Sequence, residues 1–428
     1  MSTYKSGVDM KFKLVVTRVT KSRLLRSLLL TSFGFMAAQS YAAGPQLTWS
    51  GVWQGTVGKA EVRLCLQGAG NDVNGTYYYT RYLRLIPLTV ADKRKTDSRA
   101  LVLNETMMGR SKVGSDKKAA VRDETVVWTL RASGDRQVLE GNWRSSLKEL
   151  PVQLTRAPEI APNGTTDDET QGACEGDSFN LPREQPARVG GADAKLKGLG
   201  TSYRATALDF GNRFDSEIRS FELLRDDDHA RKFNAAQRKA LTDEQSAVFE
   251  CTRNVIGRYG QQGDYNAVVE PVFIGQHWLV ARNYGSNDCG GAHPNAYMSY
   301  QTWNLDDGRT VDAWTWFNSR GAVVKMEGQG ESRYRTVEIG NVLKTALVKA
   351  WPRDDADCKG IVEDGTVFSW VAYPQVRGMT FMPELPHVAY ACTEEVTLPW
   401  VKVLPLLNAS GRKAVDAIRL EFGQPPAR

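Results

Sequence analysis

The chain has 428 residues, of which 41% are hydrophobic and 24% are charged, which is typical of a globular protein with two domains and some shorter segments. The formal net charge is +6, but the first 42 residues contain seven Lys and Arg against one Asp, so 48 basic and 48 acidic residues remain after them. A balanced remainder lacks the basic surface of nucleic-acid-binding proteins, so we expect no nucleic-acid partner.

Residues 1–42 have the pattern of a secretory signal peptide. The basic residues end at Arg26, an apolar run follows at 28–38, and the small residues Ser40 and Ala42 suit cleavage after Ala42. That run is shorter than the roughly 20 residues that span a bilayer, and no later stretch is as apolar. We therefore predict a mature chain without a membrane span, located in the periplasm or secreted after cleavage near Ala42.

Residues 47–156 predict an all-β domain. Segments such as GVWQGTVGKAEVRLCL and ETVVWTL are rich in β-branched and aromatic residues and are separated by Gly, Asn and Asp. They indicate a meander or a small barrel-like domain, because closure of the sheet removes exposed strand edges. A small apolar ligand held inside such a barrel is one hypothesis for its role.

Residues 157–200 are rich in Pro, Gly, Asp and Thr and predict a linker. Residues 201–428 mix helical and strand patterns. A helix is expected over 241–260, starting at a capping box of Thr242 and Gln245, and a second helix over 337–351. Strands are expected at 266–275, 277–285, 296–305 and 387–392. The predicted fold class is α+β, with an N-terminal all-β domain followed by a C-terminal α+β domain at 201–428.

The chain contains six cysteines, and an even number in an exported protein favours disulfides. Six cysteines allow 15 pairings, and their order along the chain favours Cys65–Cys174, Cys251–Cys289 and Cys358–Cys392. We therefore expect neither a metal site nor a cysteine nucleophile, and no cofactor.

The segment NDCGGAHPNA at 287–296 has unusual chemistry for a short loop. Gly290 and Gly291 can adopt positive φ angles, and Pro294 favours an extended conformation at His293. Cys289 and His293 alone provide too few ligands for zinc. The segment is therefore interpreted either as a structural turn fixed by a disulfide or as an exposed recognition loop.

A family resemblance follows from Tyr284, the Gly-Gly-Ala-His run at 290–293, a strand ending in Asn-Leu-Asp-Asp-Gly at 304–308 and the aromatic Phe317. With the later VFSWVAYPQ…LPW pattern, these residues resemble the extracytoplasmic domain shared by RsiV-type anti-sigma factors and PdaC-type peptidoglycan deacetylases, over roughly residues 265–410. The resemblance implies an α+β envelope domain that recognises a protein or a glycan, with a lysozyme-type protein or a peptidoglycan fragment as partner. The predicted binding residues are Tyr284, Gly290, Gly291, His293, Asn295 and Trp303.

The chain lacks a sigma-binding segment and a deacetylase domain of those families, so their activities are not carried over. The alternative is a peptidoglycan-acting hydrolase or deacetylase using His293 with a nearby carboxylate. The carboxylates available are Asp288 with Asp306 or Asp307, or Glu250. Because Asp306 and Asp307 equally suit a hairpin turn before Gly308, we predict a binding protein and assign no catalytic residue.

Three tryptophans, Trp303, Trp314 and Trp316, offer aromatic surface on which a sugar ring stacks. In a strand, Trp314 and Trp316 lie on the same side. A place in the core for at least one of them is the more ordinary expectation.

Overall fold

The computed structural model describes residues 49–69, 72–91, 100–106, 126–158, 172–197, 201–329, 333–352, 358–360, 369–385 and 387–425. The signal peptide expected at 1–42 lies outside these residues. The described residues all fall in one unit of the chain, 46–428. None of the helices described has the length and apolar character needed to cross a bilayer.

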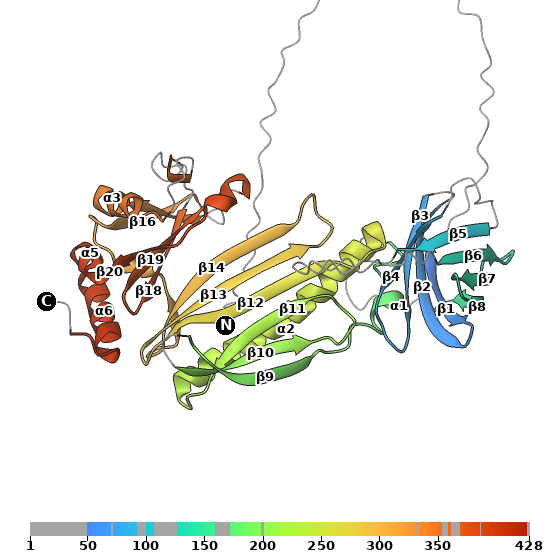
Figure 1. Ribbon diagram of the computed structural model, residues 1–428, viewed down its shortest axis with the longest axis horizontal. Coiled ribbons are helices and arrows are strands. Elements are labelled where there is room, and N and C mark those ends of the chain that lie inside the picture. The colour runs from blue at the N-terminus through green and yellow to red at the C-terminus, as the bar shows by residue number, and fades with distance from the viewer. Residues whose placement is uncertain are drawn as a thin grey trace, which may run out of the picture. The chain divides into compact units, whose positions relative to one another are not determined.

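The first eight strands form a closed antiparallel barrel in which each strand pairs with the next and β8 pairs with β1 (Figure 1). This confirms the barrel-like domain predicted from the alternating pattern. The strands are β1 (Gly51–Val57), β2 (Ala60–Ala69), β3 (Asp72–Tyr79), β4 (Ile86–Val90), β5 (Ala100–Glu105), β6 (Val127–Ala132), β7 (Val138–Arg144) and β8 (Glu149–Arg156).

The inside of the barrel is filled by side chains. Alternate residues of each strand point inward, so Leu64 and Leu66 of β2 join the interior core while Cys65 between them packs outside it. An eight-stranded barrel is just wide enough for its own side chains or for one small ligand, and here buried side chains of the described strands form the interior core. This filling gives no support to the apolar ligand of our hypothesis.

The carboxylate of Glu105, at the end of β5, accepts hydrogen bonds from three aromatic side chains of the barrel. The Oε1 atom of Glu105 accepts hydrogen bonds from Tyr77 Oη (2.6 Å), Trp128 Nε1 (2.9 Å) and Trp143 Nε1 (2.7 Å). Burial, and then the adjacent Glu105, raise the pKa of Tyr77 well above its usual range, so its hydroxyl remains a donor. Glu105, the last residue of β5, thus connects its own strand to β3, β6 and β7.

The range 157–200, expected to be a linker, contains ordered structure that is bound to both neighbouring regions. It includes the short helix α1 (Asp177–Asn180) and strand β9 (Arg188–Lys195). On the barrel side, Cys174 forms a disulfide with Cys65, and Arg63 donates to Ser178 O (2.6 Å). On the other side, Arg253 forms ion pairs with Asp177 (2.7 Å) and Glu184 (2.5 Å).

The buried side chain of Arg183 also connects this segment to both neighbouring regions. Its side chain is 1% exposed and donates to the carbonyl oxygens of Leu83 (3.0 Å) and Arg213 (2.8 Å), while its guanidinium lies 4.7 Å from the Phe214 ring. Burial lowers the pKa of Arg183 to about 10, so it stays charged at neutral pH. The described residues of this segment lack apolar periodicity, yet they are ordered. Arg183 donates hydrogen bonds to backbone carbonyls that are far away in the sequence.

The C-terminal α+β region is built on a seven-stranded sheet in the order β15-β14-β13-β12-β11-β10-β9. Its neighbours are antiparallel except β11 and β12, which are parallel and are joined by helix α2 as a crossover. The bounds are β10 (Ser202–Asp209), β11 (Glu217–Leu223), α2 (Asp228–Tyr259), β12 (Asp264–Ile274), β13 (Trp278–Asp288), β14 (Asn295–Asn304) and β15 (Arg309–Val311).

Helix α2 starts earlier than predicted. Asp227 is the N-cap, and its carboxylate accepts from His229 N (3.1 Å) and Ala230 N (2.9 Å). Thr242, expected to cap the helix with Gln245, lies in its interior and donates to Arg238 O (3.2 Å). The prediction that Thr242 and Gln245 form a capping box was therefore wrong. The first half of α2 is polar and has little apolar periodicity, so the sequence pattern did not reveal that the helix starts after Asp227.

The remaining described elements lie in the C-terminal region, and most of them contribute residues to one large hydrophobic core. They are η1 (Ala313–Trp316), β16 (Ala322–Glu327), β17 (Tyr334–Ile339), α3 (Asn341–Lys349), β18 (Ser369–Gln375), β19 (Gly378–Glu384), η3 (His387–Cys392), β20 (Val396–Pro399), α5 (Trp400–Val403), η4 (Leu404–Leu406) and α6 (Ala409–Glu421).

Three local predictions in this part were wrong. Trp314 and Trp316 lie in a 3-10 helix rather than a strand, and both are buried. The second helix begins at Asn341, because the preceding residues pair with β16. The strand expected at 387–392 is a 3-10 helix. In each case the local sequence pattern fitted more than one type of secondary structure.

Candidate functional site

Residues 278–304, which include part of the pattern behind the family resemblance, fold into one β-hairpin. Strands β13 and β14 pair in register from Trp278 opposite Asn304 to Asn287 opposite Asn295, and residues 289–294 form the connecting loop (Figure 1). The predicted loop between two strands is thus present. The hairpin occupies neighbouring positions near one edge of the sheet, with only β15 beyond it.

The base of this loop is fixed by two connections to helix α2. Cys289 forms a disulfide with Cys251, and Arg258 Nη1 donates to Gly290 O (2.7 Å). Gly290 is buried and has φ = +81°, a conformation that favours glycine. The glycine is therefore needed where the chain turns against the helix.

The tip of the loop is open to solvent. Gly291, His293 and Asn295 are exposed, and His293 Nδ1 lies 3.0 Å from Pro294 O. Four of the six predicted binding residues, these three and Gly290, thus lie together at the hairpin tip. They combine a fixed backbone with polar side chains at the surface.

Tyr284 lies further down the same hairpin, in a cluster on one face of the sheet. The Arg282 guanidinium lies 4.9 Å from the Tyr284 ring and forms an ion pair with Glu270, to which Tyr284 Oη also donates (3.4 Å). Tyr300, opposite Arg282, stacks on Tyr373 with ring centroids 4.1 Å apart. Burial, and then a hydrogen bond to Glu395, raise the pKa of Tyr300.

Trp303 does not belong to that surface. Residues opposite Tyr284 and Arg282 on β14 are even-numbered, so Trp303 points to the other face, where its ring packs edge-on against Phe233 of α2 at 5.3 Å. It contributes to the core between sheet and helix. The structure thus separates Trp303 from the other predicted binding residues.

Asp288 does not meet Asp306 or Asp307, two of the carboxylates considered for catalysis. Asp288 lies at the hairpin tip, whereas Asp306 and Asp307 follow the opposite end of β14, about 30 Å away at the usual rise per strand residue. Paired glycosidase carboxylates are about 5–9.5 Å apart. Asp306 instead lies 2.8 Å from His277 Nδ1 at the base of the hairpin. Sequence reasoning missed this pair, since 29 residues separate its members.

Acidic groups gather near the tip instead. Asp264 stands opposite Asp288 in the register of β12 and β13. Burial raises the pKa of the Asp264 carboxyl, and the negative charges of Asp215 and Asp288 add to the rise. Two carboxylates, Asp264 and Asp288, thus face each other at the end of β12 and β13 from which the loop starts.

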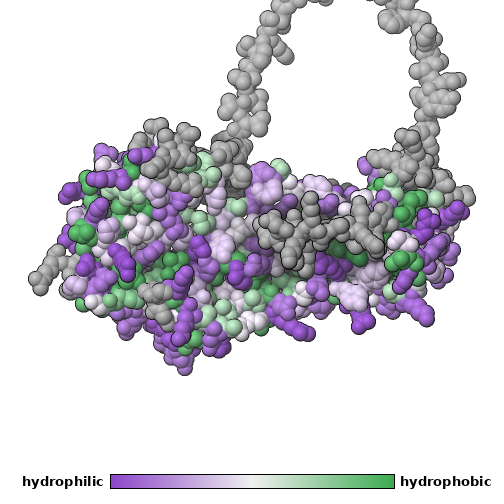
Figure 2. Space-filling model, in the orientation of Figure 1, coloured by the Kyte–Doolittle hydropathy of each residue, from purple (hydrophilic) through white to green (hydrophobic). Residues whose placement is uncertain are grey.

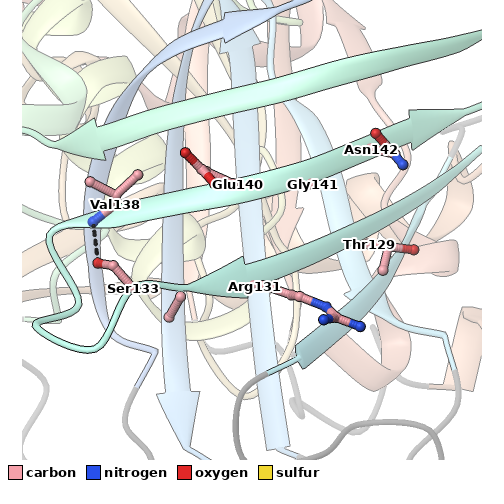
Figure 3. Close-up of a pocket in the computed structure, with 8 residues that line it drawn as sticks. Thr129, Arg131, Ser133, Val138, Glu140, Gly141 and Asn142 are labelled. Atoms are coloured by element: carbon pink, nitrogen blue, oxygen red, sulfur yellow. Dashed lines mark hydrogen bonds between the residues drawn. The ribbon is translucent and has the colours of Figure 1, made fainter.

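A separate cavity lies on the outside of the barrel. It has a volume of about 620 Å³ and lies over β6 and β7, where Thr129, Arg131, Glu140 and Asn142 line it (Figure 3). Val138 N donates to Ser133 Oγ (3.0 Å) at its end. The lining mixes these polar side chains with the apolar Ala132 and Val138.

Hydrophilic residues predominate on the face seen in Figure 2, with hydrophobic residues scattered among them. Scattered apolar residues are normal for a protein surface, whereas a large patch marks an interface. This face therefore does not itself identify a docking area.

The structure contains the three disulfides that the order of the cysteines favours: Cys65–Cys174, Cys251–Cys289 and Cys358–Cys392. Three disulfides are compatible with an oxidising compartment outside the cytoplasm. Within the described ranges, no three His, Cys, Asp or Glu side chains are grouped to hold a metal ion.

No protein-family model matches the chain, and no curated protein matches it. Among solved structures, a DUF3298 family protein from Pseudomonas aeruginosa PAO1 is similar with a TM-score of 0.30 and 12% identity, covering 57% of this chain and 100% of that one. A DUF3298 family member from Bacteroides fragilis gives 0.27 and 12%, covering 55% and 96%. Similarity at this level carries over neither a family nor a function.

Proposed function

We propose that the protein is an exported cell-envelope binding protein whose RsiV-like domain recognises a protein or glycan partner through the hairpin loop. The observation that carries the proposal is the exposed run from Gly291 to Asn295, fixed at its base by Cys251–Cys289 and Arg258. A loop held in one conformation loses little entropy on binding, which favours affinity.

The domain limits predicted from the sequence form part of this proposal. The barrel domain corresponds to residues 47–156 and the RsiV-like domain to 201–428, with β9 added to the second because it pairs with β10. The attached segment between them holds the two parts together through Arg183 and the Cys65–Cys174 disulfide.

The partner implied by the family resemblance is a lysozyme-type protein or a peptidoglycan fragment. The test is capture of the purified mature protein on immobilised lysozyme and on peptidoglycan sacculi at low salt, where charge contacts are strongest. We expect retention on one of the two. Absence of retention on both removes the proposal.

A matched pair of variants locates the binding surface. Replacing His293 and Asn295 together by Ala should weaken retention at least about tenfold, equivalent to the loss of roughly 1.4 kcal/mol. The control is Leu147→Ala, an 80% exposed residue in the barrel turn between β7 and β8, which should leave retention unchanged. Equal retention of the two variants contradicts recognition through the loop.

A further inference from the structure

The outer edge of β14 offers unpaired backbone. Strand β15 pairs with β14 only over Thr302–Asn304, so the stretch 295–301 has β13 on one side and, among the described residues, no strand on the other. Backbone N–H and C=O groups of alternate residues along this stretch therefore point away from the sheet.

This edge lacks two common protections against pairing, charged residues and prolines, although β18 lies near its Tyr300 end. Its sequence, Asn-Ala-Tyr-Met-Ser-Tyr-Gln, contains no charged residue and no proline. The opposite edge of the same sheet, β9, carries Arg188, Asp193 and Lys195 and two glycines. Native proteins protect exposed edges with charges, prolines or covering segments, so a long edge without charges or prolines indicates a strand that is used for pairing.

A cleft of about 400 Å³ runs beside this edge. Strands β14, β15 and β18 contribute to its lining, which includes the aromatic residues Tyr300, Trp314 and Trp370 together with Val311 and Val371. Among the strands that the structure describes, β18 pairs only with β19, so the cleft is flanked by a second strand edge. The space has room for one or two apolar side chains of an added strand.

The charges at the cleft are mainly acidic. Arg335 is held by Asp312 at 2.6 Å, while the exposed Glu384 forms no ion pair with another described residue. A chain lying in the cleft therefore meets a lining that is about half apolar and the negative charge of Glu384. An apolar residue followed two positions later by a basic one matches both, because such residues share a face of a strand.

We propose that the edge of β14 binds an extended peptide segment of a partner protein as an added strand, with an apolar side chain in the cleft and a basic side chain at Glu384. Added strands obtain affinity from main-chain hydrogen bonds and specificity from pockets for alternate side chains. This goes beyond recognition through the loop and does not depend on it. A second copy of this chain fits less well, since its own stretch 295–301 has no basic residue for Glu384.

The test uses a set of acetylated and amidated seven-residue peptides with Leu, Phe or Trp at the centre, Lys or Arg two positions later and Thr elsewhere. The full mature protein is titrated with each, and amide hydrogen exchange is measured. We expect binding of at least one peptide, with alternate amides in 295–301 exchanging at least about tenfold more slowly. Absence of binding by the whole set, or binding without this protection, overturns the proposal.

Two controls make the result specific. N-methylation of alternate peptide residues should weaken binding about tenfold in one register and leave it unchanged in the other, because only one set of amides faces β14. Glu384→Gln should weaken binding of these peptides and leave unchanged the binding of matched peptides that carry Thr in place of the Lys or Arg, and Leu147→Ala in the barrel should change neither. Equal binding of both N-methylated forms, or a dimer that protects 295–301 without peptide, also overturns it.

Discussion

The barrel and the seven-stranded sheet are both built mainly from antiparallel strands, yet they differ in what they leave open. In the barrel, β8 pairs with β1, the interior is filled, and the Glu105 carboxylate has three donors. The sheet ends in short β15 and charged β9, and its hairpin loop is exposed. Closure thus pairs the backbone of the barrel strands with one another, while the open sheet leaves backbone and loop groups exposed.

The largest expected effect is on the closed side of this comparison. Glu105→Ala removes the acceptor of three hydrogen bonds and leaves Tyr77, Trp128 and Trp143 without it. We expect the free energy of unfolding to fall by about 3–5 kcal/mol, measured by urea denaturation. Glu105→Gln keeps an oxygen in place and should cost less than half as much. A loss under about 1 kcal/mol for the Ala variant would show that the barrel does not depend on this carboxylate.

The next largest effect is expected in the open sheet, where the Cys251–Cys289 disulfide holds the hairpin loop. Replacing Cys251 and Cys289 by Ala should lower stability by about 2–4 kcal/mol and speed amide exchange in the loop 289–294. The matched control is removal of Cys358–Cys392, whose sequence separation of 34 is close to 38. It should cost a similar amount but leave exchange in the loop unchanged. If both variants loosen the loop equally, the disulfide is not its anchor.

Several features could be predicted from sequence because local pattern decides them. Strand alternation indicated the barrel, the order of cysteines indicated the disulfides, and the glycine pair indicated the hairpin loop. What was missed depends on distant partners. Arg183 is buried by Leu83, Arg213 and Phe214, which no spacing reveals. The edge of β14 is open only because β15 is short, which is a property of pairing rather than of β14 itself.

A smaller loss of stability is expected when Gly290, in the hairpin loop, is replaced by Ala. Gly290→Ala places a Cβ at φ = +81° and should cost about 1–2 kcal/mol, with a shifted loop and weaker partner retention. Its neighbour is the control, because Gly291 has no positive φ and a Cβ there would meet only His293 O, at 3.8 Å. Gly291→Ala should change stability by less than about 0.5 kcal/mol. Similar costs for the two would mean that backbone conformation does not fix the turn.

The smallest effect tests the start of helix α2, which anchors the loop. A hydrogen bond from Arg225, followed by the amides of the first helical turn, lowers the pKa of Asp227 to about 2. Because this value is below the roughly 3.9 of an unfolded chain, the stabilisation is complete above pH 4 and is lost as the pH falls towards 2. Asp227 is partly exposed, so the loss should stay under about 1 kcal/mol. Asp227→Asn keeps a capping side chain without the charge, and its stability should therefore change less than that of the wild type between pH 5 and 2. Parallel stability curves for the two proteins would show that the carboxylate charge does not stabilise the helix.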